Sequence, residues 1–197
     1  MARPREFDRE EALGKALQVF WTQGFEATSM SDLQRALGIG RQSLYNTFGD
    51  KASLFREAIT AYECMAGDSL ASQFGPDGGL ESIRAYFHLV ARRLTEGSPR
   101  RGCLLLSTSL ERAPHDAEIA AVTQRGLEAI RGSFAGALRQ AQAAGELAAT
   151  ADVEVLAALL THHNAGMSVL AGSGASEESL RAAADALIDQ LVQGSAG

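Results

Sequence analysis

TSMSDLQRALGIGRQSLYNTFGDK, residues 28–51, is the stretch that decides the predicted fold of the N-terminal part. Ser29 is placed to cap a helix, and Asp32 answers it three residues on, in a shortened form of the capping box. Apolar residues then recur three and four positions apart, which gives the helix one apolar face. Gly38 follows, where a chain leaving a helix often needs a left-handed backbone. A short helix ending in a glycine turn is therefore expected.

A second short helix is expected from about Arg41 to Phe48. Leu44 and Phe48 are four residues apart and face inward. A helix with one polar side suits the reading of base edges and phosphates. The outward side chains that carry hydrogen-bonding groups are Gln42, Ser43, Tyr45, Asn46 and Thr47. The stretch is thus a helix-turn-helix, and Lys51 opens the next helix where a phosphate would lie.

Motifs in and around this stretch resemble the DNA-binding domain of the TetR (tetracycline-repressor-like) family. They run in register over residues 6–66 and comprise residues 20–25, 28–30, 37–39, 44–45, 48 and 51–55. The resemblance implies an all-helical homodimer that represses transcription until a small molecule binds its second domain. Gly40 departs from the family pattern, which usually has a capping Ser or Thr, and so does Thr47, where an aromatic residue or His is common. Glycine is an acceptable N-cap, so the helix is retained without a cap hydroxyl.

The candidate DNA contacts follow from this helix-turn-helix. Gln42 and Asn46 carry amides that can pair with adenine, and Arg41 can reach guanine or phosphate. For Tyr45 the resemblance implies a hydrogen bond to phosphate, whereas Arg35 fits a phosphate clamp and a solvated charge equally well. The full set is Thr28, Ser29, Arg35, Gly40, Arg41, Gln42, Ser43, Tyr45, Asn46, Thr47 and Lys51. The basic residues 2–6 are interpreted as a tail without specific contacts.

The net charge of −6 is divided unevenly along the 197 residues. Residues 1–60 carry eight basic and eight acidic side chains, and residues 61–197 carry ten and sixteen. The acidity belongs to the second part of the chain, so it does not count against DNA binding by the first. A hydrophobic content of 46% supports a real core, and the low aromatic content of 6% favours helices packed through small side chains.

Several classes of protein are excluded. No apolar stretch approaches the 18 residues of a membrane span, and no apolar run follows the basic N-terminus, so we expect a cytoplasmic protein without a membrane partner. Cys64 and Cys103 lie far apart and show no metal-binding spacing. There is no phosphate loop, paired carboxylates or metal cluster, so we expect no cofactor, no metal and no enzymatic activity.

The periodicity predicts an all-α chain of about nine helices in two domains. Residues 6–66 form the DNA-binding domain, with the helix-turn-helix at 29–48, and residues 67–197 form a helical domain for effector binding and dimerisation. Besides the two short helices, helices are expected at 8–23, 51–74, 80–96, 103–112, 117–144, 152–171 and 177–192. The helix at 51–74 joins the two domains, so a shift of its second half would move the recognition helix.

The helix at 152–171 is apolar on two sides. One side carries Val153, Leu156, Leu160, His163, Met167 and Leu170, and the other carries Val155, Leu159, His162, Gly166 and Val169. Such a helix needs two partners, so one side is expected to meet the domain core and the other a second subunit. With the last helix it would form a twofold-symmetric four-helix interface. The expected interface residues are Val155, Leu159, His162, Gly166, Leu180, Ala184, Leu187 and Leu191.

The resemblance implies an effector pocket inside the core of the second domain. The candidate lining is mostly apolar, which favours a small hydrophobic effector: Tyr62, Met65, Tyr86, Phe87, Val90, Cys103, Phe134, His163 and Met167. The polar run at 162–164 fits satisfied core or interface groups as well as ligand contacts. The sequence therefore indicates a repressor that binds a palindromic operator as a dimer and is released by the effector.

Two alternatives stay open. One is a thiol-sensing regulator that acts through Cys103, whose pKa would be lowered by Arg100 and Arg101. The other is a small helical enzyme or carrier. It is disfavoured because no nucleophile–base pair is present and because it would leave the outward polar side chains of residues 41–48 without a purpose.

Overall fold

The computed structural model describes residues 7–75, 78–96 and 102–193, and every regular element in these ranges is a helix. The elements are α1 (Arg9–Gln23), α2 (Met30–Leu37), α3 (Arg41–Phe48), α4 (Lys51–Phe74), α5 (Leu80–Thr95), α6 (Leu104–Glu111), the 3-10 helix η1 (Ala113–His115), α7 (Ala117–Ala143), α8 (Val153–Gly172) and α9 (Glu177–Gln193). The all-α fold class is confirmed. The basic N-terminal residues 2–6 and the two arginines at 100 and 101 lie outside the described residues.

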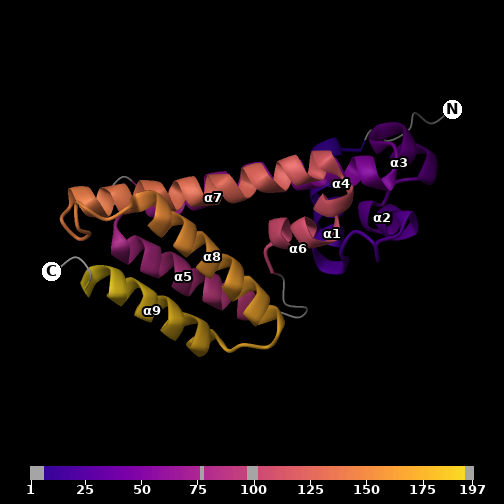
Figure 1. Ribbon diagram of the computed structural model, residues 1–197. Helices are drawn as coiled ribbons and strands as arrows, with labels where there is room; N and C mark the ends of the chain where they lie inside the picture. Colours follow the sequence, from indigo (N-terminus) through magenta and orange to yellow (C-terminus); the bar gives the residue numbers. More distant parts are fainter. Residues whose placement is uncertain (1–6, 76–77, 97–101, 194–197) are drawn as a thin grey trace.

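The helices form an elongated molecule with a small end and a large end (Figure 1). Helices α1–α3, here called the N-terminal unit, gather at one end, and α5, α8 and α9 gather at the other. Between them α4 packs along α7, while α9 packs on α5 and α8 packs on α7. Within the described ranges, no helix combines the length and the apolar character needed to cross a membrane.

Local sequence signals explain the N-terminal unit. Ser29 and Asp32 form the expected capping box, in which the Ser29 side chain accepts the Asp32 amide and the Asp32 side chain accepts the Ser29 amide. Gly38 ends α2 with φ of 70°, a left-handed conformation that favours glycine. Gly40 caps α3 without a side-chain hydrogen bond, and Asp50 caps α4 by accepting the Ser53 amide at 2.8 Å. The helix-turn-helix is therefore built from contacts only a few residues apart.

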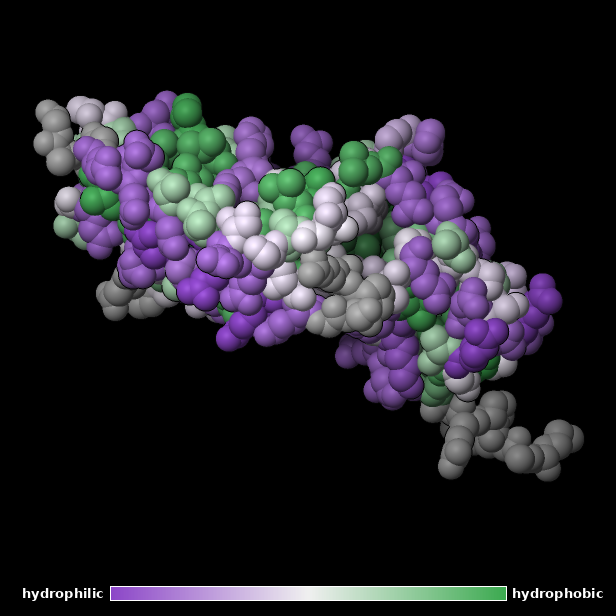
Figure 2. All heavy atoms as spheres, turned by 90° about the horizontal axis from the view of Figure 1, so that it is seen from below, coloured by the Kyte–Doolittle hydropathy of each residue, from purple (hydrophilic) through white to green (hydrophobic). Residues whose placement is uncertain are grey.

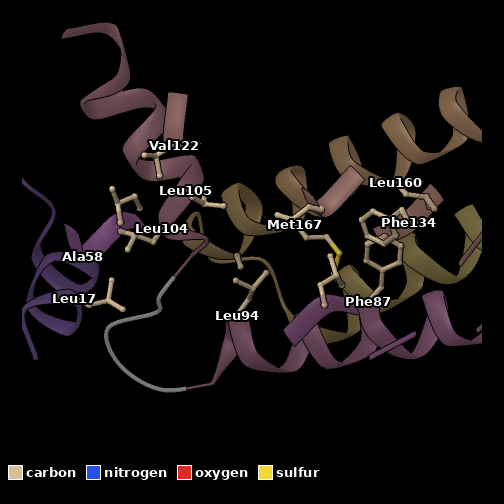
Figure 3. Close-up of a cluster of buried hydrophobic side chains, with 14 of the residues drawn as sticks. Leu17, Ala58, Phe87, Leu94, Leu104, Leu105, Val122, Phe134, Leu160 and Met167 are labelled. Atoms are coloured by element: carbon tan, nitrogen blue, oxygen red, sulfur yellow. The ribbon is translucent and has the colours of Figure 1, made fainter. Parts of the chain in front are cut away.

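A continuous apolar core links the two ends of the molecule (Figure 3). The side chains of α6 lie between the core residues of the N-terminal unit and those of α5, α7 and α8. The labelled residues in this run are Leu17, Ala58, Leu104, Leu105, Val122, Leu94, Met167, Phe87, Phe134 and Leu160. Because packed interiors have little free space, a displacement at one end of this core is felt along it.

Ion pairs tie the linking helix α4 to α7 at two points. Arg56 contacts Asp116 at 3.0 Å, and Asp116 also caps α7 by accepting the amides of Glu118 and Ile119. About two turns further on, Glu63 of α4 pairs with Arg125 of α7 at 3.2 Å. A tilt of α4 must therefore carry α7 with it or break these pairs.

Candidate nucleic-acid interface and sensor region

Helix α3 presents its polar side chains to solvent. Leu44 and Phe48 are buried and fix the helix on the N-terminal unit. The side chains that lie exposed on the other side are Arg41, Gln42, Ser43, Tyr45 and Asn46, and Thr47 is half-buried. The exposed set is accessible to a DNA groove, as direct contact with base edges and phosphates requires.

Four of the exposed side chains of α3 are arranged in two pairs. Gln42 donates a hydrogen bond to Asn46 Oδ1 at 2.9 Å. The Arg41 guanidinium lies 5.6 Å from the centre of the Tyr45 ring, within the range of a cation–π contact. On α2, Arg35 is exposed and pairs with Asp32 at 3.3 Å. These contacts hold long polar side chains in defined positions on the outer surface.

Two of the predicted DNA contacts are hydrogen-bonded to backbone carbonyls of the protein itself. Thr28 is buried, and its hydroxyl donates to the Gly24 carbonyl at 2.6 Å. The Lys51 ammonium donates to the carbonyls of Phe25 and Thr28, each at 3.0 Å. The predicted DNA contact of Thr28 is wrong in this structure because its side chain is buried, whereas Lys51 is half-buried and its phosphate contact stays a prediction. Ser29 and Gly40 remain exposed.

A group of mostly aromatic and polar side chains from α5, α7 and α8 and from the end of α4, here called the sensor region, lies inside the large end. Its members are Phe74, Tyr86, Phe87, Phe134, His163, Asn164 and Met167. The Phe134 ring lies 5.6 Å from the rings of both Tyr86 and Phe87. Tyr86 donates its hydroxyl hydrogen to Asn164 Oδ1 at 3.2 Å. The His163 ring stands edge-on to Phe87, and its buried Nε2 has no hydrogen-bond partner within the described structure.

Burial keeps the titratable groups of the sensor region neutral. It raises the pKa of Tyr86 well above its ordinary value and lowers the pKa of His163. A neutral imidazole has one nitrogen that donates and one that accepts. The region therefore holds uncharged hydrogen-bonding groups among buried apolar side chains.

The other predicted pocket residues lie at different depths. Val90 is partly buried against the core, whereas Met65 is 63% exposed, so its predicted place in a pocket is wrong. Tyr62 contacts α1 and the start of α6, since its ring meets Trp21 edge-on at 5.0 Å and its hydroxyl contacts Cys103. The predicted set is therefore split between the sensor region and the junction of α1, α4 and α6.

The environment of Cys103 does not favour a thiol sensor. Burial raises the pKa of its thiol, and hydrogen bonds from the amides of Leu105 and Leu106 and from Tyr62 offset this only in part. A reactive cysteine needs a lowered pKa, because the thiolate is the nucleophile. The thiol-sensing alternative is therefore not favoured.

Apolar side chains are exposed along one side of α8. Val155 is 62% exposed, Leu159 43% and Val169 59%, and His162 lies exposed between them. Figure 2 shows apolar patches among hydrophilic ones on one face of the part built by the C-terminal helices. Gly166 is half-buried on the same helix.

Two expectations about α8 and α9 are wrong. Leu180 and Ala184 are 2% and 0% exposed, because they fill the contact of α9 with α5 and leave no surface for a second subunit. Leu187 and Leu191 are partly buried against the same core, and their place in a dimer interface stays a prediction. Leu170, expected in the inward stripe of α8, is 56% exposed.

The structure adds residues that the sequence set left out. Asn164 belongs to the sensor region, and its signal was a polar residue between Leu160 and Met167 on the buried side of α8. Glu111 contacts the turn after α1, and no local pattern indicates a contact across 85 residues of sequence. Among the described residues, no three His, Cys, Asp or Glu side chains are grouped so that they could hold a metal ion.

Comparison with protein families gives two matches that together span most of the chain. Residues 12–58 match the model of bacterial regulatory proteins of the tetR family, and residues 79–187 match the tetracyclin repressor-like C-terminal domain. The chain is 35% identical to the transcriptional repressor ComR of Escherichia coli over 180 residues, covering 90% of this chain and 86% of ComR. It is 32% identical to the transcriptional regulator YezE of Bacillus subtilis, covering 87% and 89% of the two chains.

Solved structures agree over nearly the whole length. The chain resembles a cysteine mutant of the TetR-family regulator CifR in complex with 26-base-pair operator DNA, with a TM-score of 0.83 and 31% identity over 95% of this chain and 98% of CifR. The reduced form of NemR from Escherichia coli shares the fold, with a TM-score of 0.81 over 91% and 94% of the two chains, at 19% identity.

Proposed function

Since this chain belongs to the TetR family of bacterial regulatory proteins, we propose that it is a transcriptional repressor, which binds a palindromic operator as a homodimer and leaves it when a small hydrophobic effector binds. The relatives support a regulator rather than an enzyme, since ComR is named a repressor and CifR is seen on operator DNA. In this proposal the protein works in the cytoplasm, uses no cofactor and catalyses no reaction.

The exposed polar side of α3 is the observation that carries the proposal. Buried Leu44 and Phe48 hold the helix, while Gln42, Tyr45 and Asn46 project from it. A helix placed in this way can enter the major groove, where amides recognise adenine and a tyrosine hydroxyl contacts phosphate. We assign DNA reading to α3 and propose that DNA binding resides in residues 6–66.

A dimer follows from both ends of the molecule. One eight-residue reading helix contacts few base pairs, so two copies related by a twofold axis are needed for a specific site. The exposed apolar side of α8 gives a surface for the second copy, since a large apolar patch on a folded protein marks an interaction site. We propose that Val155, Leu159 and His162 lie in that interface, within a C-terminal domain at residues 67–197.

The sensor region is the proposed effector site. Its aromatic side chains, the Tyr86–Asn164 hydrogen bond and the unpartnered His163 Nε2 have the chemistry that suits an uncharged apolar molecule with one polar group. Such a molecule shifts the equilibrium between the DNA-binding arrangement of the dimer and the released one only as far as its affinities for these two arrangements differ. Since α4 is tied to α7 by ion pairs, we propose that occupation of the sensor region moves these two helices together.

A selection from random DNA duplexes tests the proposal. The purified protein should enrich an inverted repeat, whose half-sites lie about 34–36 Å apart or further if the site is widened. Enrichment of a single unrepeated site would contradict the dimeric mode of binding. The absence of any enriched sequence would contradict the function as a repressor.

A further inference from the structure

Two residues at the end of α6, Glu111 and Arg112, contact the turn between α1 and α2. The Glu111 carboxylate accepts the amide hydrogen of Phe25 at 3.1 Å through Oε2, and that of Glu26 at 2.8 Å through Oε1. The next residue, Arg112, contacts the Glu26 carboxylate at 3.2 Å, and its guanidinium lies 4.3 Å from the centre of the Phe25 ring. Glu111 and Arg112 together are called the clamp below.

The position of Glu111 does not stabilise α6 itself. Glu111 is the last residue of α6, and the C-terminal end of a helix carries a partial negative charge that disfavours a carboxylate. The favourable contacts of this carboxylate lie instead in the turn before α2, where two backbone amides point at its two oxygens. Hydrogen bonds to a charged acceptor are stronger than neutral ones, so this contact orients the turn firmly.

The turn held by the clamp is also tied to the start of α4. Lys51 donates to the Phe25 carbonyl, and its ammonium lies 4.2 Å from the Phe25 ring centre. The Phe25 ring is therefore contacted by a cation from α4 and by a cation from the end of α6. Because α3 directly precedes Lys51, the orientation of this turn and that of the recognition helix are linked.

A second contact joins the beginning of α6 to the N-terminal unit. Trp21 of α1 donates its indole N–H to the Gly102 carbonyl at 2.7 Å, two residues before α6 begins. Between these two contacts α6 packs closely on α7, because a Cβ added to Gly126 of α7 would lie 2.6 Å from Cδ1 of Leu105 on α6. Helix α6 is thus held at both ends by the N-terminal unit and along its side by the C-terminal helices.

We propose that Glu111 is a positioning residue, which fixes the orientation of the N-terminal unit on the C-terminal helices through the clamp, so that both recognition helices of a dimer are preset for the operator. The proposal rests on the proposed function and adds the element that passes a movement of the C-terminal helices to α3. Without the clamp, α3 stays folded but its orientation relative to the C-terminal helices is less restricted. DNA binding must then fix this orientation, and the cost of fixing it lowers the affinity for the operator.

The matched control is a carboxylate with the same chemistry at the far end of the molecule. Glu146 accepts the backbone amide of Leu80 at 2.8 Å and so caps α5. The test compares Glu111→Gln with Glu146→Gln. Each variant removes the charge and replaces one carboxylate oxygen by an NH2 group, which cannot accept a hydrogen bond. Glu111 uses both oxygens and so loses one of its two bonds, whereas Glu146 can keep its single bond through the remaining oxygen, and only the first change touches the N-terminal unit.

Two measurements decide the proposal. The first is affinity for the duplex selected by the wild type, for which we expect a loss of about tenfold in Glu111→Gln and less than about twofold in Glu146→Gln, with the dimer retained in both. The second is the emission of Trp21, the single tryptophan of the chain, which should change in Glu111→Gln alone. Wild-type affinity and emission in Glu111→Gln, or equal losses of affinity in both variants, would overturn the proposal. If the wild type prefers no duplex, the proposed function fails, while Trp21 emission still decides whether Glu111 holds this junction.

Discussion

Gln42 and Asn46, one turn apart on α3, are joined by a hydrogen bond of 2.9 Å between their side-chain amides. The pair lies exposed on the outer side of the helix, and each amide keeps a free donor or acceptor for a base edge. The two residues are therefore expected to read DNA as a unit.

A double-mutant cycle measures this coupling. Gln42→Ala and Asn46→Ala should each weaken operator binding by about 1–3 kcal/mol, and the double variant should lose less than the sum, because each single change already breaks the pair. The measurement is the dissociation constant for the selected duplex. Strict additivity would show that the two amides act independently.

The exposed side of α8 predicts how the dimer can be broken. Leu159→Glu places a charge where we expect a second copy of the chain, so sedimentation should report the mass of one chain, 20.8 kDa. Thr150→Glu adds the same charge at an exposed position before α8 and should leave the dimer intact. A Leu159→Glu variant that remains dimeric would place the interface elsewhere.

Phe134 is fully buried and contacts three aromatic rings of the sensor region, so Phe134→Ala should lower the free energy of unfolding by about 3–5 kcal/mol. Chemical denaturation measures this loss. Tyr45→Ala, which removes an exposed ring, is the control and should change the stability by less than about 0.5 kcal/mol. A similar small effect in both variants would argue against a tightly packed sensor region.

His163 gives the stability a defined pH dependence. Its folded-state pKa lies below its unfolded-state value, because burial disfavours the charged ring. As the pH falls below about 6.5, the unfolded chain binds more protons than the folded one, so the free energy of unfolding decreases. Unfolding at pH 7.5 and 5.5 should show a smaller decrease in His163→Asn than in the wild type. The exposed His115→Asn is the control, and an unchanged slope in His163→Asn would contradict the prediction.

The sequence predicted the parts of the fold that depend on neighbouring residues. The capping box of Ser29 and Asp32, the left-handed Gly38 and the limits of α3 each follow from a few adjacent positions, so pattern and structure agree. The TetR resemblance, which rested on the same local motifs, is confirmed by the two family models.

Long-range packing set the limit of the sequence-based predictions. Helix α9 has apolar residues on more than one side, and only its contact with α5 decides that Leu180 and Ala184 lie inside. The sequence did not indicate the bonds of Lys51 to the carbonyls of Phe25 and Thr28, because these partners are more than 20 residues away. The contact of Glu111 with Phe25 could not be predicted for the same reason, since the two residues are 86 positions apart in the sequence.

The most direct test of a DNA-reading α3 is a titration of the selected duplex with wild type and Tyr45→Ala at two salt concentrations. Tight wild-type binding should weaken as salt rises, because phosphate contacts release counterions. Tyr45→Ala should lose at least about tenfold in affinity while it keeps the melting temperature and dimeric mass of the wild type. Equal affinities of the two proteins, or wild-type binding that does not distinguish the selected duplex from a scrambled one, would contradict the assignment of DNA reading to α3.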